Sequence, residues 1–397
     1  MSLSKAVSLQ NARNFVLRKQ RLLPSLQGKC VDDVFDVVKN LAGVQYDPLP
    51  VVAQAHYVTL WNRVQGFRAE WLDSLLYEKR SLIEFMLMRQ ALHIVPIDEL
   101  PYYYQGVRNV FRLGWVQKAI DGLSRETKDA IVRKIKSEGV VTPKDFDFFI
   151  LRRLFFSGEI FIVKREEGVF RMPYYCLFKD YFPNVDLNSV DEETARKWLA
   201  LKTLSSFGIS STSHVAYWIG FKVKETNEIL AQLEKEGKIC KISVEGLRGT
   251  QWVRTEDLDE LERESFEEDF VALLTPMDNL VRDRRWLQQL FGYTFEIEYF
   301  QKKGMKWQVN ILHKNEFLGF INPKANRPKK SLLIKDFILR RKLDAEELEK
   351  ILARIEEFAK FHDATTIEIL NLEPKETAEA LIKHGFKRER NTLMREL

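Results

Sequence analysis

A helix-rich segment that ends in a short hairpin occurs twice in the middle of the chain, and this repeat limits the possible folds most strongly. In the first copy, helices are expected over 124–137, from Thr142 and over 149–156, before a hairpin over 158–172. In the second copy, helices over 195–207, 213–217 and 224–237 precede strands over 238–244 and 250–253. Helices followed by a two-stranded hairpin are typical of winged helices. A module of roughly 100 residues that recurs therefore predicts tandem winged helices.

The length of 397 residues leaves room for further domains on both sides of this repeat. After residue 270, alternating strands are expected over 294–300, 305–312, 317–322 and 331–340, with a turn at Lys303-Gly304 and a long helix over 344–362. We expect an α+β fold in four parts: an N-terminal helical or winged-helix domain (1–120), a second winged helix (121–190), a third (191–256), and a C-terminal mixed α+β domain with an antiparallel sheet (257–397). The charged segment 256–269 would connect the two halves.

The segment Leu41–Leu49 is the most constrained short stretch of the first part. An amphipathic helix precedes it, and Gly43 is expected to end that helix because glycine adopts positive φ without steric cost. Pro48 favours an extended chain before it, in which Gln45 and Asp47 point to the same side. Such a pair could orient a water and stabilise a developing cation. It could equally cap neighbouring backbone groups, and local geometry alone favours capping.

Basic residues gather in several short segments of the chain. Alone, each such patch is typical of a solvated surface, but beside winged helices several of them could follow a phosphate backbone. The segment 85–96 reads as a strand or hairpin, and its lone histidine also fits an ordinary core or capping role. The candidate DNA-binding residues are Arg89, His93, Lys164, Arg165, Arg248, Arg282, Arg284, Arg285, Lys324, Arg327, Lys329 and Lys330.

Composition excludes several classes of protein. The three cysteines are scattered and the six histidines form no H-x-x-x-H pair, so we expect no metal site, no disulfide framework and no cofactor. No apolar run approaches the length of a membrane span. A net charge of +5 is compatible with nucleic acid as a partner. We expect a monomeric, cytoplasmic and nucleoid-associated protein without a membrane partner.

Two longer motifs resemble a known family. The run Leu273–Leu287, followed by Leu290-Phe291-Gly292-Tyr293, is similar to a signature of the AlkZ/YcaQ-type winged-helix DNA glycosylases, and Leu318–Arg327 is similar to a second one. The resemblance extends over the whole chain. The catalytic signature of that family is Gln-x-Gln or Gln-x-Asp, and Gln45-Tyr46-Asp47 resembles the second form, as in the YcaQ-like branch.

This resemblance implies a monofunctional DNA glycosylase that hydrolyses the N-glycosidic bond of alkylated, N7-substituted purines in double-stranded DNA. Members of the family also unhook interstrand crosslinks. The resemblance reverses the interpretation of the pair: Asp47 would stabilise the oxocarbenium ion and take a proton from water, and Gln45 would position that water. An N7-alkylated purine is already cationic, so it leaves without a strong general acid.

Two features differ from the family pattern. The segment Met88–Val95 is more similar to the AlkZ-like branch than to the aromatic-His-Glu-Ala run of the YcaQ-like branch. The usual Gly-Arg-x-Asp-x-Lys becomes Gly319–Lys324, which lacks one Arg and the Asp, and the basic aromatic loop before it is reduced to Gln301–Gly304. The main alternative is a non-enzymatic winged-helix transcription regulator, and a weaker one is a helicase-accessory or RNA-binding module.

Overall fold

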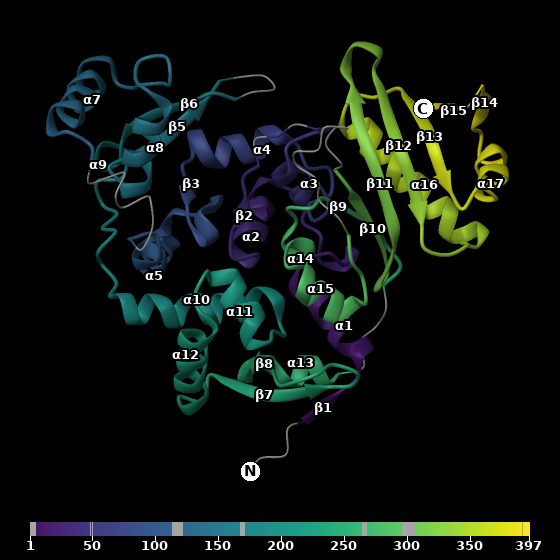
Figure 1. The fold of residues 1–397 in the computed structure, drawn as a ribbon, viewed down its shortest axis with the longest axis horizontal. Coiled ribbons are helices and arrows are strands. Elements are labelled where there is room, and N and C mark those ends of the chain that lie inside the picture. The colour runs from purple at the N-terminus through teal and green to yellow at the C-terminus, as the bar shows by residue number, and fades with distance from the viewer. Residues whose placement is uncertain are drawn as a thin grey trace.

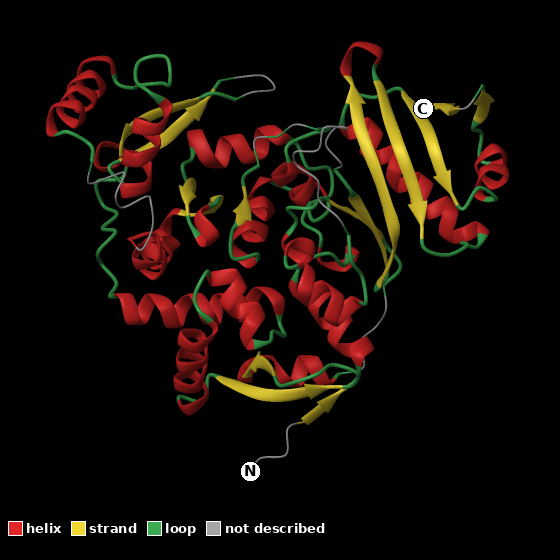
Figure 2. Cartoon of the chain, viewed as in Figure 1, coloured by secondary structure: helices red, strands yellow, loops and turns green. Residues whose placement is uncertain are grey.

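The computed structural model describes residues 5–47, 49, 51–112, 122–166, 171–263, 268–295, 307–390 and 392–397. Its fold is mixed α+β, with helix-and-hairpin modules beside a C-terminal sheet (Figures 1 and 2). Among the described residues, no helix is both long enough and apolar enough to cross a bilayer.

The first module begins with the predicted amphipathic helix. Its elements are α2 (Val31–Asn40), β2 (Val44–Gln45), α3 (Ala55–Trp61), α4 (Ala69–Asp73) with η2 (Ser74–Glu78), β3 (Leu82–Met86) and β4 (Leu92–Pro96). The strand order is β2-β4-β3, so the first strand pairs with the second strand of the hairpin. The helix that ends before Gly43 and the strands within 85–96 are thereby confirmed.

The second module repeats this order with one difference from the expectation. Its elements are α7 (Arg125–Glu138), α8 (Phe148–Ser157), β5 (Ile160–Arg165) and β6 (Pro173–Leu177), and Val141 bridges to Tyr175 of β6. The helix expected from Thr142 is wrong. The Asp145 carboxylate accepts hydrogen bonds from the Thr142 N–H and hydroxyl, and this closes a turn instead. Part of the expected hairpin, 167–170, lies outside the described residues.

The third module contains α10 (Glu192–Phe207), α11 (Thr212–Ile219), α12 (Val223–Lys235), β7 (Ile239–Val244) and β8 (Gln251–Arg254). All of these elements were expected, within a few residues. Ser210 forms an isolated bridge to Trp252 of β8, so here too the residues after the first helix lie beside the last strand of the hairpin. The charged connector begins as η5 (Thr255–Asp257) and α13 (Leu258–Glu262).

The first residues of the chain belong spatially to the third module. β1 (Lys5–Val7) pairs in parallel with β7, and α1 (Leu9–Lys19) follows it. The reason is apolar burial, because Val7 and Phe15 share a core with Phe207 and Ile242. This differs from the expectation that 1–120 forms one N-terminal domain. After β4, η4 (Ile97–Glu99) and α5 (Leu100–Arg112) lead towards α10, and α9 (Phe178–Tyr181) follows β6. The expected boundary at 120 lies outside the described residues.

The C-terminal part is a seven-stranded sheet with the order β14-β15-β13-β12-β11-β10-β9. Its elements are β9 (Val271–Leu274), α14 (Asn279–Arg282), α15 (Arg284–Phe291), β10 (Val309–His313), β11 (Glu316–Asn326), η6 (Arg327–Lys329), β12 (Ser331–Leu339), α16 (Ala345–Phe361), β13 (Thr366–Glu373), α17 (Thr377–Lys383), β14 (Lys387–Glu389) and β15 (Thr392–Glu396). The sheet is not wholly antiparallel as expected. α16 carries the chain back across it, so β12 and β13 are parallel. The strand expected over 294–300 and the turn at Lys303-Gly304 lie largely outside the described residues.

A shared hydrophobic core fixes the first module against this sheet. Val34, Leu41 and Trp61 belong to the same buried cluster as Ile321 and Phe358. Joint burial of these apolar side chains is the main force that holds the two parts together. The short strand β2 is therefore attached to a rigid base.

Candidate functional site

The turn that leads into β2 depends on left-handed backbone at two successive residues. Ala42 has φ 56° and Gly43 has φ 90°. A Cβ atom at Gly43 would lie 2.8 Å from the Val95 side chain, so this position also lacks space for a side chain. Beyond the turn, Gln45 lies opposite His93 of β4. The position of the Gln45-Tyr46-Asp47 segment is thus set by its sheet partner.

Asp47 is a buried carboxyl group. Only 5% of the residue is exposed, and its Oδ1 accepts a hydrogen bond of 2.9 Å from the Leu49 N–H. Burial raises the pKa of Asp47 to about 6, and the hydrogen bond from Leu49 offsets part of that rise. The capping role weighed from the sequence is therefore present. However, one hydrogen bond satisfies only part of what a buried carboxylate can accept.

Gln45 lies in the wall of a cavity of about 590 Å³. The side chain is half-buried, and its Oε1 is buried without a hydrogen-bond partner among the described residues. A buried amide oxygen without a partner costs free energy, so its retention requires an explanation. The volume is in the range of pockets that enclose small organic ligands.

Elements of the first two modules enclose this cavity. Its walls come from β2, from the β3–β4 hairpin, from α8 and from the β5–β6 hairpin. Aromatic and aliphatic side chains dominate, and among the described lining residues the ionisable ones are arginines and a few tyrosines. The lining residues are Gln45, Tyr46, Met86, Ala91, Leu92, Phe148, Arg152, Phe155, Ile162, Arg165, Arg171, Met172, Pro173 and Tyr175.

Tyr46, between the two candidate catalytic residues, is held from both faces. Its ring stacks on His56 at 4.3 Å between centroids, and the Arg165 guanidinium lies 4.2 Å from the Tyr46 centroid. Arg165 itself forms an ion pair of 2.6 Å with the buried Glu84. Arg165 was a candidate for phosphate binding, but here its charge is neutralised and its plane supports Tyr46. These contacts orient the strand segment on which Gln45 and Asp47 lie.

Residues 38–361 match the sequence model of the AlkZ-like family, described as DNA glycosylase AlkZ-like. The chain belongs to the AlkZ-like DNA glycosylase family. The resemblance inferred from the motifs is thereby confirmed, and membership implies an enzyme that acts on DNA.

A solved structure agrees with this assignment. The DNA glycosylase AlkZ of Streptomyces sahachiroi is similar to this chain with a TM-score of 0.63 and 14% identity, over 92% of this chain and 100% of that one. At this identity, the likeness establishes the mixed α+β fold. The N-terminal domain of a ribosomal-protein-alanine acetyltransferase from Clostridium acetobutylicum covers 24% of this chain and 87% of its own, at 17% identity, and its TM-score of 0.20 is too low to indicate a shared fold.

In this AlkZ-like chain, the Leu273–Leu287 signature holds the strand that carries Gln45. Asn279 Nδ2 donates to the Leu41 and Gly43 carbonyls at 2.7 and 3.0 Å, at the turn immediately before β2. Asp278, in turn, forms a fully buried ion pair of 2.7 Å with Arg63 of the first module. The sequence identified this motif as a family signature but did not reveal its role. Only the folded chain brings it next to residues 41–43.

Two candidate DNA-binding residues are instead paired with each other. Arg282 Nη1 donates to His93 Nε2 at 2.9 Å, and His93 is completely buried. The His93 Nδ1 lies 2.8 Å from the Ala91 carbonyl, so the ring is neutral with its proton on Nδ1. Burial, with the nearby Arg282 charge, lowers the pKa of His93 to about 3. His93 therefore fits the ordinary core role weighed for it, next to Gln45 in the sheet.

The structure distributes the other basic candidates over several faces. Arg89 lies 3.9 Å from the ring centroid of Tyr217, and Arg327 donates to the Val52 carbonyl at 2.8 Å. The turn between β11 and β12, which carries Lys329 and Lys330, is at the top of Figure 1. The turn between β7 and β8, which carries Arg248, is at the bottom, so the two turns lie far apart. The remaining candidates are exposed: Lys164, Arg248, Arg284, Arg285, Lys324, Lys329 and Lys330.

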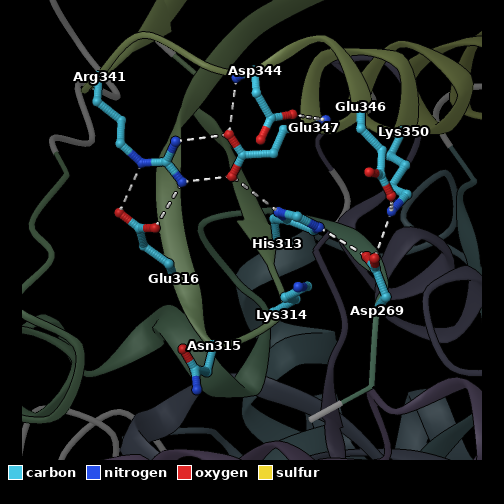
Figure 3. A pocket seen from close by; sticks show the side chains of 10 residues that line it. All are labelled: Asp269, His313, Lys314, Asn315, Glu316, Arg341, Asp344, Glu346, Glu347 and Lys350. Carbon is cyan, nitrogen blue, oxygen red and sulfur yellow. Dashed lines mark hydrogen bonds and ion pairs between the residues drawn. The ribbon is translucent and has the colours of Figure 1, made fainter.

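A second pocket, of about 200 Å³, lies at the start of α16 and is lined by charged side chains (Figure 3). Arg341 bridges Glu316 and Glu347 at 2.9 and 2.7 Å. His313 contacts Asp269 at 2.9 Å, and Lys350 also pairs with Asp269. Most of the charges in this pocket already satisfy one another. The candidate active site is therefore the first cavity, where Gln45 Oε1 has no hydrogen-bond partner among the residues that the structure describes. Asp47 follows Gln45 by two residues but is not one of the described residues that line this cavity.

Proposed function

We propose that this protein is a monofunctional DNA glycosylase that hydrolyses the N-glycosidic bond of N7-alkylated purines in double-stranded DNA, as a monomer. The observation that carries the proposal is the buried Asp47 carboxyl, with its pKa raised to about 6, two residues from Gln45 in the wall of the arginine-lined cavity. Membership in the AlkZ-like family supports the reaction class. Perturbed carboxyl groups beside a cavity are common at catalytic sites.

The three modules fit a scaffold for duplex binding. We propose that they are winged helices, because in each one the strand or bridge after the first helix lies beside the last strand of a hairpin. Under this proposal the chain divides near 120, 190 and 256, with β1 and α1 joining the third unit. The exposed basic candidates named above would contact phosphates. Arg165, His93 and Arg282 would instead hold the Gln45-Tyr46-Asp47 segment in place.

The chemistry follows from the burial of Asp47. Cleavage of an N-glycosidic bond develops positive charge on the sugar, and a poorly solvated carboxylate stabilises that charge more strongly than one in water. In the proposed step, the bond between sugar and purine breaks, and the electron pair leaves with the base. The oxygen of a water molecule bonds to the sugar, and Asp47 accepts a proton from that water. Gln45 positions the water.

Two features support water as the nucleophile and a cationic base as the substrate. The described residues that line the cavity include no lysine, which a Schiff-base mechanism requires. An N7-alkylated purine already carries a positive charge, so it departs without a general acid, and the described part of the lining holds no Asp, Glu or His. Unhooking a crosslink through N7 is cleavage of the same bond, which makes crosslinked purines a second candidate substrate.

The alternative of a non-enzymatic regulator predicts Gln45 and Asp47 on a solvent surface or in a simple cap. The burial of Asp47 weighs against a surface position, and the raised pKa weighs against a cap that serves stability alone. A capping aspartate is stabilising when hydrogen bonds lower its pKa, and here burial dominates.

The decisive experiment is base release from a duplex that contains N7-methylguanine. We expect the native protein to release the base and Asp47→Asn to lose at least about 100-fold in rate while duplex binding is kept. Gln45→Ala should lose less. Asp283→Asn is the matched control, because Asp283 is also buried with a raised pKa but caps α15 and is not part of the Gln45-Tyr46-Asp47 segment. Near-native release by Asp47→Asn would refute the mechanism, and tight binding without release by the native protein would favour the regulator.

A further inference from the structure

Two adjacent phenylalanines are unusually exposed at the start of α8. Phe149 is 62% exposed and Phe148 is 43% exposed, although large apolar side chains are usually buried. Their rings contact each other edge-to-face, at 5.8 Å between centroids. Exposed apolar groups that cluster in this way mark interaction sites more often than single exposed residues do.

The backbone at this pair is well fixed despite its exposure. The Asp147 carboxylate accepts hydrogen bonds from the Phe149 and Ile150 N–H groups, at 2.9 and 3.2 Å, and so caps α8. A capped first turn presents the two rings with little backbone freedom. Rigid aromatic groups lose little conformational entropy when they bind, which suits them to act as anchors.

The pair stands at the border of the candidate active site. Phe148 lines the same 590 Å³ cavity as Gln45, and Arg152, one turn further along α8, lines it as well. The Arg152 guanidinium lies 5.3 Å from the centroid of the Phe156 ring. In the described part of the chain, no carboxylate lies within ion-pair distance of Arg152. Aromatic faces beside an arginine match the stacked bases and charged phosphates of a nucleic acid.

We propose that Phe148 and Phe149 act as an aromatic wedge on DNA at the lesion. Phe149 inserts into the base stack next to the damaged nucleotide, and Phe148 stacks against the damaged base at the cavity wall. Apolar wedges between base steps unstack and kink a duplex, which is easiest where a lesion already weakens the stack. The proposal rests on the proposed function, because the occupant is a duplex whose damaged nucleotide lies beside Gln45.

The test uses a duplex that carries a tetrahydrofuran abasic analogue with 2-aminopurine as its neighbour. The native protein should quench the 2-aminopurine when an aromatic ring stacks on it. Phe149→Ala should abolish this quenching and bind the analogue duplex roughly 5- to 150-fold more weakly, as base–aromatic stacking energies of about 1–3 kcal/mol imply. Binding to an undamaged duplex should stay unchanged. Phe149→Trp should restore the quenching, because a larger ring stacks at least as well.

Val223→Ala provides the matched control. Val223 is the first residue of α12 in the third module and is 54% exposed, but it does not line the cavity. We expect this variant to behave as the native protein. Equal weakening on damaged and undamaged duplexes by Phe149→Ala would overturn the wedge. Concentration-dependent dimerisation that Phe149→Ala abolishes would also overturn it, in favour of a contact between copies of the chain.

The abasic analogue separates this proposal from the proposed function. It needs no base release, so the quenching can be measured with Asp47→Asn even if the native protein releases no N7-methylguanine. Release without any dependence on Phe149 would refute the wedge and leave the glycosylase reaction intact. Quenching that depends on Phe149 in a protein without base release would support the wedge and refute the reaction.

Discussion

Two carboxyl groups in this molecule have opposite environments. Burial raises the pKa of Asp47 to about 6, whereas the hydrogen bonds from Arg341 lower the pKa of Glu347 to about 2. Glu347 lies in the charged pocket of Figure 3, where its oxygens face Arg341 and His313. Within the described part of the chain, Asp47 accepts one hydrogen bond, from the Leu49 N–H.

Ionised Glu347 stabilises the folded state, whereas ionised Asp47 destabilises it. Glu347 gains partners on folding, so its ionised form is favoured in the native state. Asp47 loses water on folding without comparable compensation, so its ionised form is disfavoured. Such uncompensated burial persists where the group has a further use, as in catalytic sites. The pocket richest in charge is therefore not the better candidate for chemistry.

The largest expected effect on stability is a gain from Asp47→Asn. The folded-state pKa of Asp47 lies above its ordinary value of 3.8, so the ionised group destabilises the fold above pH 6 and not below pH 4. Removal of the charge should raise the free energy of unfolding by roughly 1–3 kcal/mol at pH 7. Denaturant unfolding at pH 7 and pH 4 would show a gain that disappears in acid. A loss of stability at pH 7 would contradict this account.

A second test removes the side chain of Asn279, which holds the turn before β2 and therefore the position of Gln45 and Asp47. Asn279→Ala leaves the buried Leu41 and Gly43 carbonyls without this donor, at a cost of about 1–3 kcal/mol. Base release should also fall several-fold, because Gln45 and Asp47 follow that turn. Asn310→Ala is the control, since the buried Asn310 donates to the Leu274 carbonyl in the sheet. It should cost stability without a loss of release by the folded protein.

The pH dependence of base release gives a third test. The proposed reaction needs ionised Asp47, so the rate should rise about tenfold between pH 5 and pH 7 and then level off, with a midpoint near the pKa of about 6. Asp47→Asn should remove this dependence from any residual activity. A native profile that is flat across this range would assign the essential charge to another group.

The smallest effect is expected at the other carboxyl group. Glu347→Gln should lower stability by less than about 1 kcal/mol at pH 7, because the Arg341 ion pair is partly exposed. The contribution of Glu347 is present above its ordinary pKa of 4.5 and is lost as the pH falls towards 2. Base release should be unchanged. A marked loss of release by Glu347→Gln would show that the two regions are coupled.

Local features of the sequence predicted local structure well. Ser8, Ser124 and Asp344 cap helices as their positions suggest, and Gly43 lies where its freedom at positive φ is needed. The Gln45–Asp47 pair was predicted from extended geometry together with the family resemblance, and its role stays a prediction. The burial of Asp47 was not predictable, because it depends on elements that are distant in sequence.

Contacts between distant segments were the least predictable features of the structure. Arg282 pairs with His93, and no local signal in either segment indicates this contact. The same applies to the pairing of β1 with β7, which moves the first residues into another module. The parallel pairing of β12 with β13 could have been inferred, since a long helix between two strands is the usual crossover connection.

The pairing of β1 with β7 also has a consequence for how the chain folds during synthesis. Lys5 lies opposite Ile242, so the first strand leaves the ribosome long before its partner exists. Until β7 emerges, β1 and the apolar face of α1 have no native surface to cover them, and contacts of such large sequence separation form slowly. The pairing therefore joins β1 to a strand that is synthesised much later. The nascent chain is most exposed to aggregation before that pairing.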